Sequence, residues 1–109
     1  MKREQLQFRK GFRVSVGNDR SQGAVMVLRP GDCEGGPDNR HRGADQWLYV
    51  VEGTGAATIN RNKVLLKAGT LVLIEAGDTH EIATLLKAVS VYLPPAYDAE
   101  GEELPRGRP

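Results

Sequence analysis

The chain has 109 residues, with 15 lysines and arginines against 14 aspartates and glutamates, and this length suits one domain with a single core. The near balance of charge gives no support for a nucleic-acid partner or for an acidic membrane surface. The single cysteine, Cys33, excludes an intrachain disulfide and a cysteine-rich zinc site. No stretch is apolar for long enough to span a membrane. We therefore expect a cytoplasmic protein that binds small molecules or other proteins.

The N-terminal part of the sequence predicts an arm followed by two strands and a loop. Residues 1–11 are polar and basic, so we expect an arm or at best a short edge strand. Phe12–Val16 alternates apolar and polar side chains, which is typical of a half-buried strand. Ala24–Leu28 is a short apolar run that a Pro-Gly pair ends, which favours a second strand. From Arg29 to Ala44 the chain is rich in Gly, Pro and Asp, which predicts a long loop.

The rest of the sequence predicts short strands separated by turns. Gln46–Val51 is rich in aromatic and β-branched residues, and a turn at residues 52–55 should follow it. The other expected strands are Ala56–Ile59, Lys63–Leu66, Leu71–Glu75, His80–Leu85 and Ala88–Leu93. About eight short strands without a helical period indicate an all-β sandwich or barrel. We expect one domain at residues 1–93 and a flexible, charged C-terminal tail at residues 94–109.

Some of the expected strands are apolar at consecutive positions and do not alternate. The runs AVMVL, WLYVV and TLVLI show this pattern. A strand that is apolar on both sides meets protein on both faces. In so short a chain a second copy is the partner that we expect, which predicts a homodimer. Cover by the terminal arms is the alternative.

Two stretches of the sequence resemble the two motifs of the cupin superfamily. The first runs from Asn39 through His41 and Gln46 to Gly53, and the second ends at the Gly-Asp-Thr-His sequence that contains His80. In that family the first motif carries two histidines and a glutamate, and the second carries a third histidine. The resemblance implies a double-stranded β-helix, which is a jelly-roll barrel, over most of the chain.

The resemblance also implies a divalent metal ion, Mn, Fe, Ni or Zn, with Asn39, His41, Gln46 and His80 as its ligands. Asn39 and Gln46 replace a histidine and the glutamate of the family, and a neutral amide brings no charge to offset a dication. Asp45 is the alternative ligand, although strand alternation places it on the face opposite Gln46 unless a bulge intervenes. Without a metal, His41 would be a solvated loop residue and His80 a hydrogen-bonded core residue.

Two functions follow from this resemblance. The first is a metal-dependent oxygenase or isomerase that acts on a small molecule inside the barrel. The second is a non-catalytic module that binds or senses a small ligand at a weakened metal site. Gln46 cannot transfer a proton near neutral pH, which favours the second function. Whether the chain is an enzyme stays open at this point.

Overall fold

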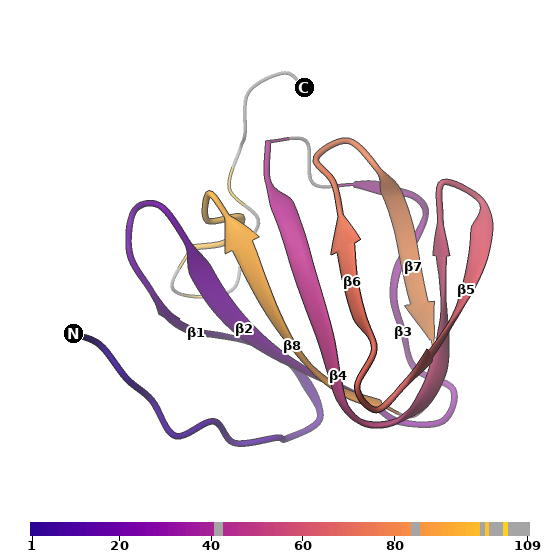
Figure 1. Ribbon diagram of the computed structural model, residues 1–109, viewed down its shortest axis with the longest axis horizontal. Helices are drawn as coiled ribbons and strands as arrows, with labels where there is room; N and C mark the ends of the chain where they lie inside the picture. Colours follow the sequence, from indigo (N-terminus) through magenta and orange to yellow (C-terminus); the bar gives the residue numbers. More distant parts are fainter. Residues whose placement is uncertain (41–42, 84–85, 99, 101–103, 105–109) are drawn as a thin grey trace.

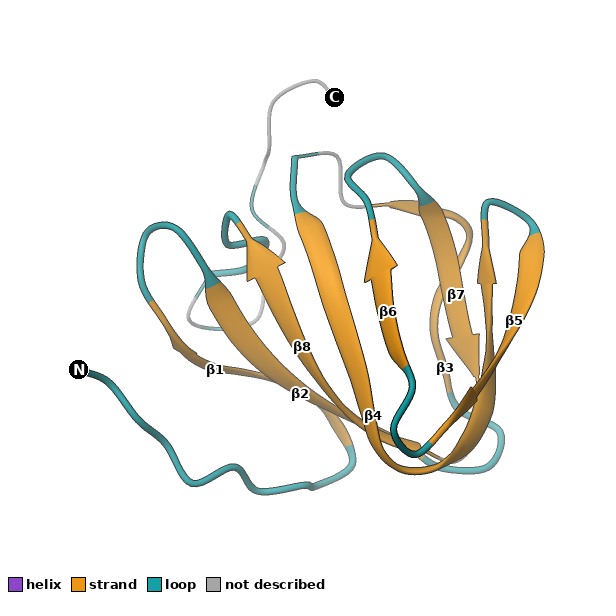
Figure 2. Ribbon diagram, viewed as in Figure 1, coloured by secondary structure: helices purple, strands orange, loops and turns teal. Residues whose placement is uncertain are grey.

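The computed structural model describes residues 1–40, 43–83, 86–98, 100 and 104, and for residues 33–40 and 86 it describes the backbone alone. The strands are β1 (Gly11–Gly17), β2 (Gln22–Leu28), β3 (Cys33–Arg40), β4 (Asp45–Ile59), β5 (Asn62–Lys67), β6 (Leu71–Ile74), β7 (Thr79–Ala83) and β8 (Leu86–Leu93). Figure 2 shows that strands and loops make up the described part, so the all-β prediction is confirmed. In that part no helix is long and apolar enough to cross a membrane.

Strand β4 belongs to two sheets and joins them. Its first part, residues 45–53, pairs with β8 on one side, and residues 46–49 pair with β6 on the other. Its second part, residues 54–59, pairs with β5, and residues 56–59 pair with β7. Strands β1 and β2 extend the first sheet beyond β8, and β3 extends the second sheet beyond β7. The sheets curve around a common interior (Figure 1), which is the jelly-roll barrel that the sequence predicted.

The interior of the barrel is filled by apolar side chains from both sheets. On β4, Leu48 and Val50 are fully buried, whereas Trp47 and Tyr49, which alternate with them, are exposed. The buried members of the cluster are Met26, Leu28, Leu48, Val50, Ala57, Leu66, Ile82 and Ala88. The alternation along β4 is the period of two that a strand imposes on its side chains.

Strand β3 lies inside the segment that the sequence predicted to be a loop, so that prediction was wrong for these residues. The backbone of β3 pairs with β7 from Cys33 opposite Ala83 to Gly36 opposite His80, and the register shifts before Arg40. Glycine, proline and aspartate have low intrinsic strand preference. Hydrogen bonds to the neighbouring β7 backbone hold the segment as a strand. Local sequence patterns do not predict pairing with a strand that is distant in the sequence.

The turn expected at residues 52–55 is a bend within β4, which is a second correction. The register with β8 shifts between Val50 and Glu52, and Gly53 has a φ of 96°. Only glycine adopts that φ without strain, so the chain bends here and passes from one sheet to the other. The chain reverses later, at Asn60 and Arg61, whose φ values are 50° and 67°. Two positive φ values are typical of a tight hairpin loop, and this loop joins β4 to β5.

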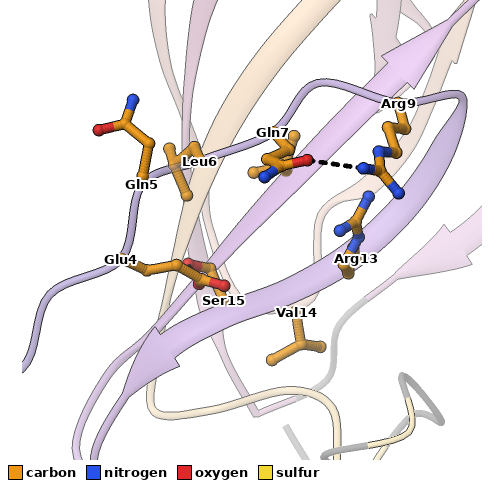
Figure 3. Close-up of a pocket in the computed structure, with 9 residues that line it drawn as sticks. Glu4, Gln5, Leu6, Gln7, Arg9, Arg13, Val14 and Ser15 are labelled. Carbon is orange, nitrogen blue, oxygen red and sulfur yellow. Dashed lines mark hydrogen bonds between the residues drawn. The ribbon is translucent and has the colours of Figure 1, made fainter.

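The N-terminal arm, residues 1–10, lies over β1 and β2 and forms no strand. A groove of about 280 Å³ separates part of the arm from β1 (Figure 3). Val25 of β2 also lines this groove. Arg9 donates to Oε1 of Gln7 at 2.8 Å within the arm. The hydroxyl of Ser15 donates to Glu4 and ties the arm to β1. The arm therefore covers the outer face of the first sheet at its β1–β2 edge.

Beyond the part that the arm covers, the outer face of the first sheet carries exposed apolar side chains. We call this set the apolar stripe; its members are Trp47, Tyr49, Leu71, Leu73, Val91 and Leu93, between 37% and 58% exposed. Trp47 lies opposite both Leu73 and Val91 in the sheet, and Tyr49 lies opposite Leu71. The stripe is therefore continuous across β6, β4 and β8.

After β8 the chain turns back against β2. Oε1 of Gln22 accepts hydrogen bonds from the backbone N–H groups of Ala96 and Tyr97, both at 3.1 Å. Ala96 is buried, and the ring of Tyr97 packs edge-on against Tyr92 with centroids 5.2 Å apart. These contacts attach Ala96 and Tyr97, which follow the barrel, to β2 and β8. The flexible tail at residues 94–109 stays a prediction.

Candidate functional site

Gln46, the second residue of β4, points into the barrel. Its side chain is only 3% exposed, and its Nε2 donates a hydrogen bond of 3.0 Å to the hydroxyl of Ser90. Its Oε1 is buried and has no hydrogen-bond partner among the described residues. A buried acceptor without a donor costs about 1–3 kcal/mol. Native proteins keep few such atoms, so this one indicates a position for a ligand or an ion.

Asp45, the alternative ligand, has a different role in the structure. Its Oδ1 accepts a hydrogen bond of 2.9 Å from the backbone N–H of Ala76, in the turn between β6 and β7. Because neighbouring side chains of a strand face opposite ways, Asp45 holds this turn while Gln46 faces the interior. The structure thus places Gln46, and not Asp45, inside the barrel.

His80, the second residue of β7, also belongs to the interior. Its side chain is 2% exposed, and it lies directly opposite Ile59, which packs against the core. The start of β7 is held by Asn60 of the hairpin loop, which accepts from the N–H of Thr79 at 3.0 Å and donates to Asp78 at 2.9 Å. The hairpin loop therefore fixes the strand end that carries His80.

The same end of the barrel holds both Gln46 and His80. Gln46 lies opposite Ile74, the last residue of β6, and His80 comes just after the turn that links β6 to β7. Figure 1 shows that the start of β4, the end of β6 and the start of β7 all lie at the upper end as drawn. The two side chains enter the interior from different sheets, Gln46 from the first and His80 from the second.

The structure describes the other two predicted ligands, Asn39 and His41, only in part. Asn39 lies on β3, whose backbone runs beside the start of β7, with Arg40 opposite Thr79. Its backbone is therefore close to the strand end that carries His80, and its side chain is not described. His41 lies outside the described residues. The complete predicted set of four ligands stays a prediction.

The described donors at this end are one imidazole and one amide oxygen. Among the described residues, no group of three or more His, Cys, Asp and Glu side chains is placed to hold a metal ion. Imidazole binds Zn, Cu, Fe and Ni well, whereas a neutral amide oxygen is a weak ligand. Since the amide oxygen of Gln46 is buried without a partner, these residues fit a weakly held cation or a ligand that donates a hydrogen bond.

Sequence reasoning missed Ser90, which contacts Gln46. Among the described side chains of β8 the buried ones are Ala88, Ser90 and Tyr92, so Ser90 occupies an inward position between Ala88 and Tyr92. The available signal was a small polar residue at a strand position where the alternation predicts an apolar side chain that faces inward. It could have shown that a second polar group lies beside Gln46.

A family model described as a cupin domain matches residues 24–92, which is more than half of the chain. No curated protein matches the chain. A solved structure from Bacillus halodurans is 24% identical, with a TM-score of 0.72, and the match covers 88% of this chain and 76% of that one.

Two further solved structures are similar to the chain. KdgF from a Halomonas species is 18% identical with a TM-score of 0.70, and the match covers 77% of each chain. A protein from Thermotoga maritima, described as a predicted oxalate decarboxylase, is 27% identical with a TM-score of 0.61. That match covers 68% of this chain and 66% of the other. These likenesses agree with the barrel described above.

Proposed function

The chain belongs to the cupin family, and on that premise we propose that it binds a divalent metal ion and a small-molecule ligand beside Gln46 and His80. The observation that carries this proposal is the buried Oε1 of Gln46, which has no hydrogen-bond partner among the described residues. A cation, or a hydrogen supplied by a ligand, would remove the cost of that buried acceptor. His80 lies at the same end of the interior and supplies an imidazole.

The metal in this proposal is Mn, Fe, Ni or Zn. His80 and Gln46 would hold it, and Asn39 and His41 complete the predicted set. A bound ion would supply a Lewis acid that polarises an oxygen-rich ligand. With two amides in place of a histidine and a carboxylate, the set has less negative charge than a site of three histidines and one glutamate, so we expect weaker binding.

Two kinds of function remain for such a site. One is a metal-dependent oxygenase or isomerase, and a Thermotoga protein with a similar fold is described as a predicted oxalate decarboxylase. The other is a non-catalytic binding or sensing module. The amide of Gln46 supports the second, because an amide bonded to a serine hydroxyl cannot serve as an acid or a base near neutral pH. A cytoplasmic location stays a prediction.

Metal content is the direct test of the proposed site. We expect protein purified without chelators, or incubated with Mn, Fe, Ni or Zn, to carry about one ion per chain, because one set of ligands holds one ion. Elemental mass spectrometry measures this ratio, and calorimetric titration gives the affinity. If the protein binds none of the four ions at millimolar concentration, the proposed metal site is refuted. The proposal that then remains is the binding of a small ligand without a metal.

We also expect the apolar stripe to join two copies of the chain. Soluble monomers rarely expose continuous apolar patches of more than a few hundred Å², and the N-terminal arm leaves the six side chains of the stripe exposed. Trp47 and Leu73 lie opposite each other near its centre. A symmetric interface would bury each substituted residue twice, so Trp47→Lys is expected to separate the two copies.

Light scattering coupled to size-exclusion chromatography tests this homodimer. The wild type should elute at twice the chain mass, and Trp47→Lys at the mass of one chain. Leu65→Lys is the control, because Leu65 is just as apolar and more exposed but lies on β5, outside the stripe. A monomeric wild type would refute the dimer, and loss of the dimer in Leu65→Lys alone would place the interface elsewhere.

A further inference from the structure

Ser90 is the described side chain that holds the amide of Gln46. On β8, Ser90 lies opposite Leu48, while Gln46 lies opposite Tyr92. The two residues are therefore diagonal neighbours on the inward face of the sheet, within reach of each other's side chains. Both are almost fully buried, and 3.0 Å separates Nε2 of Gln46 from the hydroxyl oxygen of Ser90.

This hydrogen bond decides which end of the amide faces the interior. A primary amide has an acceptor oxygen on one side and a nitrogen with two N–H donors on the other. With the nitrogen bonded to Ser90, the oxygen is the atom left over, and it is buried without a partner among the described residues. The reverse orientation would let Ser90 donate to the oxygen, but it would turn two N–H groups toward the interior. In the observed orientation Ser90 accepts from one of those N–H groups, so the oxygen is the end of the amide that a ligand can meet.

We propose that Ser90 is a positioning residue, which holds Gln46 so that its carbonyl oxygen faces the ligand. The interior then offers an acceptor at this point. It suits an electropositive atom, either a divalent cation or the hydrogen of a hydroxyl or ammonium group, and it disfavours a carboxylate. The part of this inference that concerns a cation rests on the proposed function. The orientation of the amide does not depend on it, because it rests on the hydrogen bond between Gln46 and Ser90.

The same reasoning explains why an amide needs Ser90 and a carboxylate does not. The two oxygens of a glutamate are equivalent, so either one can face a cation in any orientation. The two ends of a glutamine differ, so a free amide would spend part of its time with the wrong end inward. Ser90 therefore matters for binding when residue 46 is glutamine and loses most of its importance after Gln46→Glu.

A set of four proteins tests this dependence: the wild type, Ser90→Ala, Gln46→Glu and the double variant with both changes. Zn²⁺ affinity is measured by calorimetric titration, and the side-chain amide of Gln46 is followed by ¹⁵N-resolved NMR. We expect Ser90→Ala to weaken Zn²⁺ binding about tenfold, within the range of one lost hydrogen bond. In the Gln46→Glu background the same change should weaken binding less than about threefold.

The NMR signal supplies a readout that a packing role would not move. In the wild type without metal, one proton of the Gln46 amide should resonate downfield because it is bonded to Ser90, and in Ser90→Ala it should move to the position of a free amide. An unchanged amide signal in Ser90→Ala would overturn the proposal. So would an equal loss of Zn²⁺ affinity in both backgrounds, because that pattern indicates packing alone.

The two readouts also separate this inference from the proposed metal site. If none of the four proteins binds Zn²⁺, the metal proposal loses its support, and the metal-free amide signal decides the role of Ser90. A shifted signal then supports the orientation of Gln46 toward a hydrogen-bond donor. An unshifted signal refutes it.

Discussion

Replacing Leu66 by alanine is expected to destabilise the fold by about 2–5 kcal/mol, the range for a leucine removed from a packed core. Leu66 is 1% exposed and belongs to the cluster that fills the barrel. It lies on β5, whose other face is open to solvent. The shortened side chain would leave a cavity that the sheet cannot close, because backbone hydrogen bonds hold β5 to β4.

Leu65, the next residue on the same strand, is the matched control. It is 77% exposed, so Leu65→Ala should change the free energy of unfolding by less than about 0.5 kcal/mol. Thermal unfolding followed by circular dichroism compares the two variants. For a chain of this size a loss of 1 kcal/mol lowers Tm by about 4–8 °C. Similar Tm values for both variants would contradict the placement of Leu66 in the core.

Replacing His80 by alanine is expected to lower the affinity for a divalent metal ion by about a hundredfold or more. Changes in residues that only support metal ligands already cost about ten- to a hundredfold, and His80 is proposed to bind the ion directly. It is also the one imidazole at this end of the described interior, and imidazole is a much stronger ligand than the neutral amide of Gln46.

Gln46→Ala is the comparison for the histidine variant. Because an amide oxygen contributes less to binding, we expect it to lower affinity about tenfold, less than the change at His80. His41→Ala should also reduce the metal content if His41 belongs to the set. Calorimetric titration measures the affinities, and circular dichroism confirms that each variant is folded. Equal metal content in the wild type and in His80→Ala would refute the site.

Much of the fold was predictable because its signals are local. Alternating or continuous apolar runs marked six of the strands within a few residues of their observed bounds, and marked β4 as two separate strands. The strand β3 was not predictable in this way, since its glycines and proline resemble a loop. Its pairing partner β7 is distant in the sequence.

The candidate site was also predictable only in part. Motif spacing pointed to Gln46 and His80, and both are buried at one end of the barrel. The spacing could not show which polar groups surround them. Ser90 and Asp45 acquire their roles from contacts across the sheet and at the β6–β7 turn, and these contacts join residues that are 44 and 31 positions apart.

The sequence by itself determined the class of fold, because the period of a strand and the preferences of turn residues act over a few neighbouring positions. The tertiary structure alone decided that β4 bends through Gly53 into the second sheet. It also decided that Asp45 holds a turn, and that Ser90 accepts a hydrogen bond from the amide of Gln46. The physical reason is that hydrogen bonds and burial depend on which strands become neighbours, and the closure of the barrel sets those neighbours.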